Sequence, residues 1–177
     1  MLFELLQRIC RSLEEHEIPY MVSGSIAMNM YSIPRMTRDI DIVIELSESG
    51  IDQFLELFPE SYYNKDVIIY EIKHKGMFNI IDHSTGFKID FIIRKESEYF
   101  NLAFNRRIRI HEFGTDLWVI GLDDLIIAKI IWIQQYQSEL QMMDIKNLLF
   151  KPDKDIDYIK KWCKQLGLNT FRLLDHE

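Results

Sequence analysis

Residues 24–43 read GSIAMNMYSIPRMTRDIDIV, and the two ends of this stretch decide the fold. Gly24-Ser25 follows a short apolar run, and a glycine between a strand and a helix lets the backbone turn tightly. At the other end, Asp39 and Asp41 alternate with isoleucines, which is the period of a strand. Two aspartates with this spacing point to the same face of the strand, so their carboxylates can converge on one point.

Converging carboxylates have two interpretations. Two negative charges near a sheet edge repel each other unless a cation lies between them, and hard oxygen ligands suit Mg²⁺. The alternative is a strand with one solvated polar face, which is the commoner origin of such a pair. The Gly24-Ser25 turn favours the metal, because amide groups at a helix N-terminus bind phosphate and Ser25 adds a hydroxyl donor. Taken alone, that turn is also consistent with a plain helix cap.

A third carboxylate is needed for phosphoryl transfer with two metal ions. Asp90 is the candidate, since it is the one acid among the apolar residues of a predicted strand over 87–93. Burying a lone carboxylate costs several kcal/mol unless something pairs with it, and a metal ion would do so. The alternative partners are Lys88 and Arg94, which share its face of the strand.

Together these segments resemble the nucleotidyltransferase superfamily, whose fold is that of DNA polymerase β. The signature lies in Gly24-Ser25, in the helix after it and in residues 37–41, and its nearest branch is that of the bacterial abortive-infection nucleotidyltransferase toxins and their uncharacterised relatives. The resemblance touches most of residues 20–150 and includes the segments 87–91, 121–129 and 144–149. It implies an α/β (α+β) protein with a mixed β-sheet flanked by helices and a C-terminal helical extension.

The resemblance also implies roles for single residues. The catalytic and metal-binding residues are Asp39, Asp41 and Asp90. The nucleotide-binding residues are Gly24, Ser25, Arg38, Lys129 and Asp144. Two departures from the branch are Met143, which stands where a basic residue is frequent, and the shortness of the chain.

Two of these residues also have interpretations that need no resemblance. Lys129 interrupts an apolar helical stripe, so it either snorkels to solvent or supplies a positive charge to a triphosphate. Arg38 and the nearby Arg35 can neutralise phosphate or pair with a neighbouring acid. Residues 106–109, RRIR, are the one dense basic patch, which is either a solvated strand edge or a track for the phosphates of an acceptor.

The function implied is metal-dependent transfer of a nucleoside monophosphate from an NTP to a hydroxyl group, with Mg²⁺ or Mn²⁺ as cofactor. RNA, tRNA or protein is the expected acceptor, and the protein is then a toxin of a toxin-antitoxin or phage-defence system with an antitoxin partner. One alternative is a small-molecule enzyme acting on something like an aminoglycoside, which an acidic acceptor pocket would favour. A second alternative is a non-catalytic nucleotide-binding or interaction module of the same fold.

Hydrophobic periodicity predicts a mixed α/β core over residues 1–121 and a helical extension over 122–177. The resemblance implies that this core is the nucleotidyltransferase core, with the extension packed on it. In the core we expect helices at 2–16, 25–31, 49–58 and 97–104, and strands at 19–23, 39–44, 77–81, 87–93, 108–113 and 117–120. In the extension we expect helices at 123–136, 141–150 and 155–166.

Composition sets the remaining bounds. The 177 residues carry 21 basic and 28 acidic side chains, a net charge of −7, which argues against indiscriminate coating of nucleic acid. Cys10 and Cys163 form no disulfide framework, and the five histidines show no zinc-ligand spacing. Charged residues interrupt every apolar run before it reaches the length of a signal peptide core or a membrane span. We expect a cytoplasmic protein without a membrane partner.

Overall fold

The computed structural model describes residues 1–112 and 114–175. Within them a seven-stranded sheet has the order β3-β4-β5-β2-β1-β7-β6. The strands β2 and β5 are parallel, as are β1 and β7, and the other neighbouring pairs are antiparallel. The sheet is therefore mixed, as the sequence predicts. Its strands are β1 (Tyr20–Val22), β2 (Asp39–Ile44), β3 (Ser61–Tyr62), β4 (Met77–Asp82), β5 (Lys88–Ile93), β6 (Ile108–Glu112) and β7 (Thr115–Val119).

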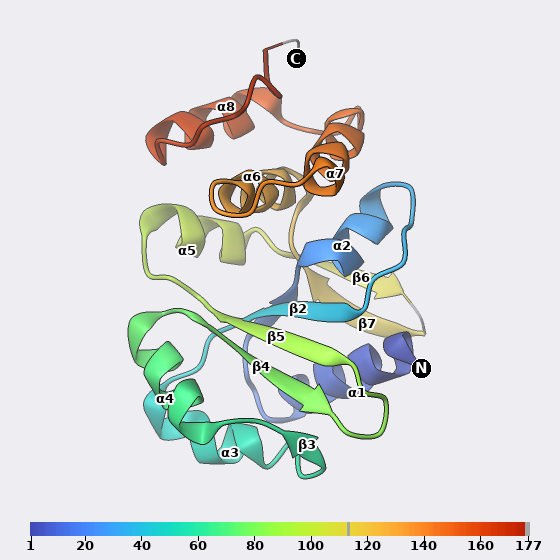
Figure 1. Ribbon diagram of the computed structural model, residues 1–177, viewed down its shortest axis with the longest axis vertical. Helices are drawn as coiled ribbons and strands as arrows, with labels where there is room; N and C mark the ends of the chain where they lie inside the picture. Colours follow the sequence, from blue (N-terminus) through green and yellow to red (C-terminus); the bar gives the residue numbers. More distant parts are fainter. Residues whose placement is uncertain (113, 176–177) are drawn as a thin grey trace.

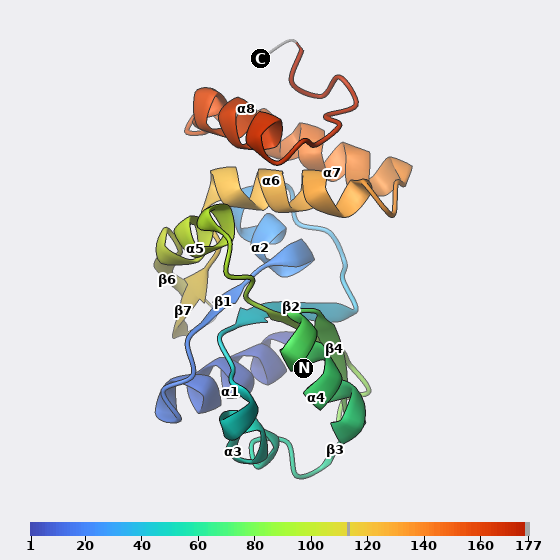
Figure 2. The same ribbon diagram turned by 90° about the vertical axis from the view of Figure 1, so that its left-hand side faces the viewer.

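Helices cover both faces of this sheet (Figures 1 and 2). They are α1 (Leu2–Glu15), α2 (Gly24–Tyr31), α3 (Ile51–Leu55), α4 (Lys65–His74), α5 (Glu98–Asn105), α6 (Leu122–Ile133), α7 (Glu139–Leu149) and α8 (Ile156–Gln165), with a short 3₁₀ turn at Glu48–Gly50. Figure 2 shows α1 and α3 on one side of the sheet, with α2, α5 and α6 on the other.

Isoleucine and aspartate side chains alternate along strand β2, and this alternation determines which face of the sheet packs into the core and which face carries the candidate site. Ile40, Ile42 and Ile44 are fully buried, whereas Asp39 and Asp41 are only partly buried. Successive side chains of a strand point to opposite faces, so the isoleucines and the aspartates lie on opposite sides of the sheet. The aspartates lie on the side that carries α2 and α6.

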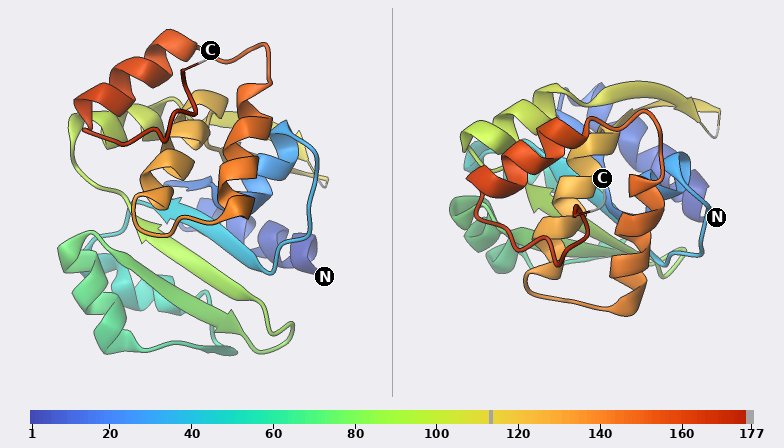
Figure 3. Two further views of the ribbon diagram at one scale, coloured as in Figure 1. Left: turned by 45° about the horizontal axis from the view of Figure 1, so that its top comes forward. Right: turned by 90° about the horizontal axis from the view of Figure 1, so that it is seen from above.

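The last three helices stack beyond α2 and α5 (Figure 3). Helix α6 is apolar nearly all round, because it contacts α2 on one side and both α7 and α8 on the other.

The division of the chain at residues 121/122 stays a prediction. No helix in the described part of the chain is long and apolar enough to cross a membrane. Cys10 and Cys163 are buried free thiols.

Most predicted elements are confirmed to within a few residues, but four differ. The two-residue strand β3 was not predicted. Helix α4 was not predicted; it begins after Asn64, whose side chain accepts hydrogen bonds from two backbone amides, and it ends at Lys75 with a φ of 52°. The predicted helix 49–58 is a 3₁₀ turn followed by the short α3. Strand β7 begins at Thr115, earlier than predicted, and Phe113, the predicted end of the strand before it, lies outside the described residues.

Candidate active site

The parallel pairing of β2 with β5 brings the three predicted carboxylates to one face of the sheet and to one cavity. Asp41 lies directly opposite Asp90, and Asp39 lies opposite Lys88. Residues opposite each other in neighbouring strands share a face, so all four side chains point to the side of α2 and α6. The three aspartates line one cavity of about 240 Å³, whose walls also include Gly24, Ser25 and Lys129.

Burial and the two neighbouring carboxylates make the charged form of Asp41 unfavourable. Burial first, and then the charges of Asp39 and Asp90, raise the pKa of Asp41 to about 6, against smaller lowering effects of Lys129 and of the Ser25 amide. The Thr37 hydroxyl donates to Asp39 Oδ1 at 2.7 Å. Three carboxylates facing one cavity are thus an unfavourable arrangement that a cation would relieve.

The partner of Asp90 is Lys88, one of the two alternatives that the sequence left open. Lys88 Nζ lies 2.6 Å from Asp90 Oδ2. Arg94, the other alternative, pairs instead with Glu45. Asp90 is only 4% exposed, and its second oxygen, Oδ1, is buried without a hydrogen-bond partner. An orphaned carboxylate oxygen of this kind is costly, and it marks a position where a ligand would bind.

The described residues contain no cluster of three His, Cys, Asp or Glu side chains gathered closely enough to hold one ion. The predicted metal ligands Asp39, Asp41 and Asp90 share a face and a cavity, but with Lys88 on Asp90 they do not meet around a common point. The donor set still fits Mg²⁺, because it consists of carboxylate oxygens on one face of two neighbouring central strands and includes the orphaned Oδ1.

Gly24 is required by its closeness to Asp41. Its φ is +60°, and a Cβ atom at this position would lie 1.9 Å from Asp41 Oδ2 and 2.7 Å from Asp41 Cβ. Helix α2 begins here, and the Ser25 backbone amide is hydrogen-bonded to Asp41. The Gly24-Ser25 turn was predicted to bind phosphate. In the structure one of its backbone amides, that of Ser25, is hydrogen-bonded to the Asp41 carboxylate instead.

A buried ion network links this turn to the last helices. Asp144 accepts hydrogen bonds from Lys129 Nζ at 2.9 Å and from Arg35 Nε and Nη2 at 3.1 and 2.9 Å. Arg35 Nη2 also donates to the Ser25 hydroxyl at 2.8 Å. Burial by itself would raise the pKa of Asp144, but the hydrogen bonds from Arg35 and Lys129 outweigh it and hold that pKa below its usual value.

This network argues against one of the two interpretations of Lys129, a side chain that snorkels to solvent. The side chain is only 5% exposed and lines the carboxylate cavity, so it does not snorkel to solvent. Its charge is shared with Asp144, which is 2% exposed, rather than being free for a phosphate. Arg38, the remaining predicted nucleotide-binding residue, is exposed and does not line the cavity.

Sequence reasoning missed several residues that line the cavity, among them Trp132 and Gln141, and did not include Lys88 or Arg35 among the site residues. Trp132 lies three residues after Lys129 on α6, and Gln141 lies three residues before Asp144 on α7. Helical neighbours at this spacing share a face, so the positions of Lys129 and Asp144 were the available signal.

A second cavity of about 600 Å³ adjoins the first and shares with it Ser23, Met77, Ile92, Ala128 and Trp132.

The basic patch at residues 106–109 does not line either cavity. Arg106 pairs with Asp123 and Asp124, Arg107 lies over the rings of Phe104 and Trp118, and Arg109 pairs with Glu14 and Asp116.

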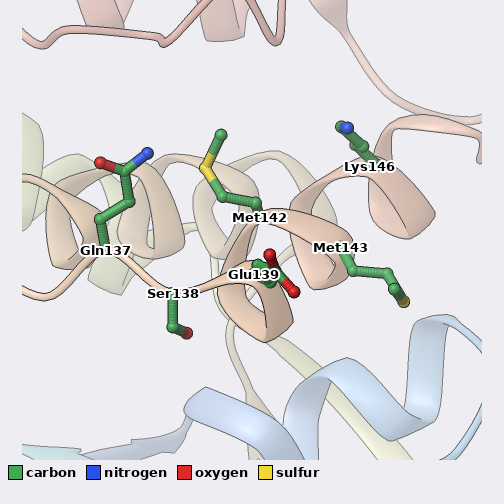
Figure 4. A pocket seen from close by; sticks show the side chains of 6 residues that line it. All are labelled: Gln137, Ser138, Glu139, Met142, Met143 and Lys146. Carbon is green, nitrogen blue, oxygen red and sulfur yellow. The ribbon is translucent and has the colours of Figure 1, made fainter.

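A separate hollow of about 530 Å³ lies at the start of α7 (Figure 4). Its lining includes none of the predicted site residues, and the labelled side chains in Figure 4 point in different directions rather than toward a common centre. It offers no convergent polar groups for a substrate. Its lining residues are Gln137, Ser138, Glu139, Met142, Met143 and Lys146.

Comparison with known sequences gives two matches of different extent. The profile of the family described as "Nucleotidyltransferase of unknown function (DUF6036)" matches residues 1–170. The "Global transcriptional regulator Spx 1" of Oceanobacillus iheyensis is 28% identical over 74 residues, which are 42% of this chain and 53% of that protein. The chain thus spans about half the length of this curated relative.

Comparison with solved structures finds the same fold in enzymes of low sequence identity. The complex of ANT(2")-Ia with adenylyl-2"-tobramycin is 13% identical, with a TM-score of 0.53 over 93% of this chain and 88% of that chain. The lincomycin-bound lincosamide antibiotic adenylyltransferase LnuA is 15% identical, with a TM-score of 0.53 over 84% and 94%. A putative nucleotidyltransferase from Thermotoga maritima is 14% identical, with a TM-score of 0.51 over 93% of each chain.

Proposed function

The chain belongs to the nucleotidyltransferase family whose profile matches residues 1–170, and from this premise we propose the reaction that it catalyses. The protein transfers a nucleoside monophosphate from an NTP to a hydroxyl group, and Mg²⁺ or Mn²⁺ is required. The observation that carries this proposal is the pairing of Asp41 with Asp90, which places both acids beside Asp39 around one cavity at the start of α2.

The chain's own residues divide the work between nucleotide and acceptor. Asp39 and Asp41 hold the metal-bound triphosphate near the start of α2, where Ser25 contributes its hydroxyl and Arg35 lies within hydrogen-bond distance of that hydroxyl. Asp90, on the neighbouring strand, faces the acceptor. When bound, the metal ions neutralise charge on the entering and leaving oxygens. Positioning and charge neutralisation are the main sources of rate enhancement in such transfers.

The bond changes follow from these positions. The acceptor oxygen forms a bond to the α-phosphorus, and the bond from that phosphorus to the bridging oxygen breaks. Pyrophosphate leaves with the electron pair, and the hydroxyl proton passes to the Asp90 carboxylate and then to water. Lys88 stays on Asp90 Oδ2 in this step, and the unpartnered Oδ1 is the oxygen that accepts the proton.

Lys129 and Asp144 act together in this proposal. Lys129 lines the cavity from α6, and Asp144 fixes its ammonium group and the Arg35 guanidinium in place. When a triphosphate enters, it competes with Asp144 for these two cations. The network then orients two positive charges at the edge of the site without leaving either one unpaired in the free protein.

The acceptor is less defined than the reaction. RNA or protein as the acceptor, a toxin role and an antitoxin partner stay predictions from the sequence resemblance, as does a cytoplasmic location. The aminoglycoside-like alternative was tied to an acidic acceptor pocket. The 600 Å³ cavity beside the carboxylates contains no Asp or Glu among its described lining residues, which disfavours a cationic acceptor.

The test is a transfer assay with nucleotides labelled at the α-phosphorus. The protein is incubated with each labelled NTP, Mg²⁺ and, in separate reactions, cellular RNA, cellular protein and a small-molecule extract. We expect label transfer and pyrophosphate release with at least one of these acceptors, and neither with the Asp39→Ala/Asp41→Ala variant. Equal transfer by the double variant would show that these carboxylates do not catalyse the reaction.

A further inference from the structure

The 600 Å³ cavity beside the carboxylates has a chemical character of its own. It runs from Ser23 and Trp132, which it shares with the carboxylate cavity, to α5 and the start of β4. Most of its lining residues are aliphatic or aromatic, and its volume is that of a site for a drug-sized molecule. Trp132, 45% exposed, stands at the junction, and its ring centroid lies 5.3 Å from that of Tyr136. We call this cavity the α5–α6 cleft.

The charges around the α5–α6 cleft are all positive. Lys75, Arg94 and Lys95 line it, and no acid does so among the described residues. Two of these cations are balanced from outside the cleft, since Lys75 pairs with Glu96 at 2.8 Å and Arg94 with Glu45. Lys95 lies 5.3 Å from the centroid of the Phe100 ring and has no carboxylate partner within residues 1–112 and 114–175.

We propose that the α5–α6 cleft is the acceptor subsite, and that its occupant is a small hydroxyl compound with an apolar ring body and a negatively charged group. This inference rests on the proposed transfer reaction. The ring body lies against Trp132 and the aliphatic wall, the anionic group reaches Lys95, and the hydroxyl points through the shared opening toward Asp90. The balanced step is the one given above, with this hydroxyl as the attacking group.

Two other acceptor classes fit the α5–α6 cleft less well. A polycation such as an aminoglycoside would meet three cations and no carboxylate. An RNA strand needs a track of basic side chains for its phosphates. The dense basic patch at 106–109 does not supply one, since its three arginines are occupied by intramolecular partners.

The probe for the test is 1-anilinonaphthalene-8-sulfonate, a flat aromatic anion whose fluorescence rises in apolar surroundings. It is titrated into the full chain, with and without saturating MgATP. Lys95→Glu reverses the unbalanced charge, and Lys161→Glu is the matched control, because Lys161 is also exposed and lies 5.4 Å from an aromatic centroid outside the cleft. Ile131→Trp fills the cleft, and Leu140→Trp adds the same side chain at an exposed position on α7 outside it.

We expect saturable binding of the dye that Lys95→Glu weakens at least tenfold and Lys161→Glu changes less than twofold. Ile131→Trp abolishes binding, and Leu140→Trp does not. MgATP leaves the dye affinity unchanged within threefold, because both subsites must be filled together for transfer. Tobramycin and a short RNA oligonucleotide do not displace the dye.

The proposal is overturned if Lys95→Glu and Lys161→Glu behave alike, if tobramycin or RNA displaces the dye, or if MgATP competes with it. Calorimetry of MgATP on the same samples separates the two levels of the argument. If MgATP fails to bind at all, the proposed reaction fails, and with it the acceptor role of the α5–α6 cleft. If MgATP binds but the dye does not bind at the α5–α6 cleft, only the acceptor class is wrong.

Discussion

Asp41 on β2 lies directly opposite Asp90 on the parallel strand β5, so two acids occupy neighbouring positions on one face of the sheet and line the same cavity. A folded protein gains no stability from such a pair. Burial and the neighbouring carboxylates raise the pKa of Asp41 to about 6, which means that its ionised form is held at a cost. Active sites commonly carry this kind of local instability for the sake of function.

The first prediction follows from that cost. Asp41→Asn removes the repelled charge but keeps an oxygen acceptor for the Ser25 amide. The distance from the ordinary pKa to about 6 corresponds to ~3 kcal/mol at most, and partial exposure to water reduces it. We expect the free energy of unfolding at pH 7.5 in excess chelator to rise by about 1–2 kcal/mol. Urea denaturation measures it, with Asp153→Asn in an exposed loop as the control; a loss of stability in Asp41→Asn would contradict this account.

The second prediction concerns Gly24. Gly24→Ala meets both an unfavourable positive φ and an overlap with Asp41, including its Cβ atom, which cannot move away without shifting strand β2. Gly167→Ala is the matched control, since its φ is +65° and no atom lies within 4 Å of the added Cβ. The control should cost about 1–2 kcal/mol of stability for the backbone alone. Gly24→Ala should cost at least ~2 kcal/mol more. Equal melting temperatures for the two variants would show that the contact between position 24 and Asp41 does not restrict this position to glycine.

The third prediction concerns Lys129. Packing of the stem alone would make Lys129→Met harmless to stability, but the ion pair with buried Asp144 changes that expectation. Because Arg35 remains as a partner of Asp144, we expect a loss of about 1–3 kcal/mol in unfolding free energy. The double variant Lys129→Met/Asp144→Asn should recover part of it. ATP binding should weaken by about 1.5–3 kcal/mol in Lys129→Met, as measured by calorimetry. Wild-type affinity in this variant would show that Lys129 serves structure alone.

The fourth prediction is a pH dependence of stability. Arg35 and Lys129 hold the pKa of Asp144 below its ordinary value, so the folded state binds this proton more weakly than the unfolded state. The resulting stability is fully present above the unfolded pKa of about 4, and it is lost as the pH falls through the folded pKa. The difference in unfolding free energy between wild type and Asp144→Asn should therefore shrink below about pH 4. A difference that stays constant from pH 7 to pH 3 would rule this out.

Local sequence patterns were sufficient to predict much of the fold. The alternation of aspartate with isoleucine predicted strand β2 and its two faces, and two apolar runs predicted the strands β4 and β5 that pair as a hairpin. Helix α4 was missed because its apolar residues form no clean stripe, and its one clear signal was the capping side chain of Asn64. Short elements such as α3 depend on packing against the sheet more than on their own sequence.

Most residues of the candidate site could be predicted from the sequence, but the side chains with which they form ion pairs and hydrogen bonds could not. The three acids and Lys129 stand out as charges among apolar neighbours, and the structure places all four around one cavity. Their partners were not predictable, since Arg35 and Asp144 are 109 residues apart and meet only when α7 packs against α2. Arg38, three residues after Arg35, has the same charge but lies exposed.

The central claim is that Asp39 and Asp41 bind a nucleotide through a divalent metal ion. Isothermal titration calorimetry with ATP tests it most directly, on the wild type and on Asp39→Asn/Asp41→Asn, each with Mg²⁺ and with excess chelator. We predict that Mg²⁺ strengthens ATP binding to the wild type at least tenfold and has no such effect on the double variant. Equal affinity of the wild type for ATP in Mg²⁺ and in chelator would contradict the account.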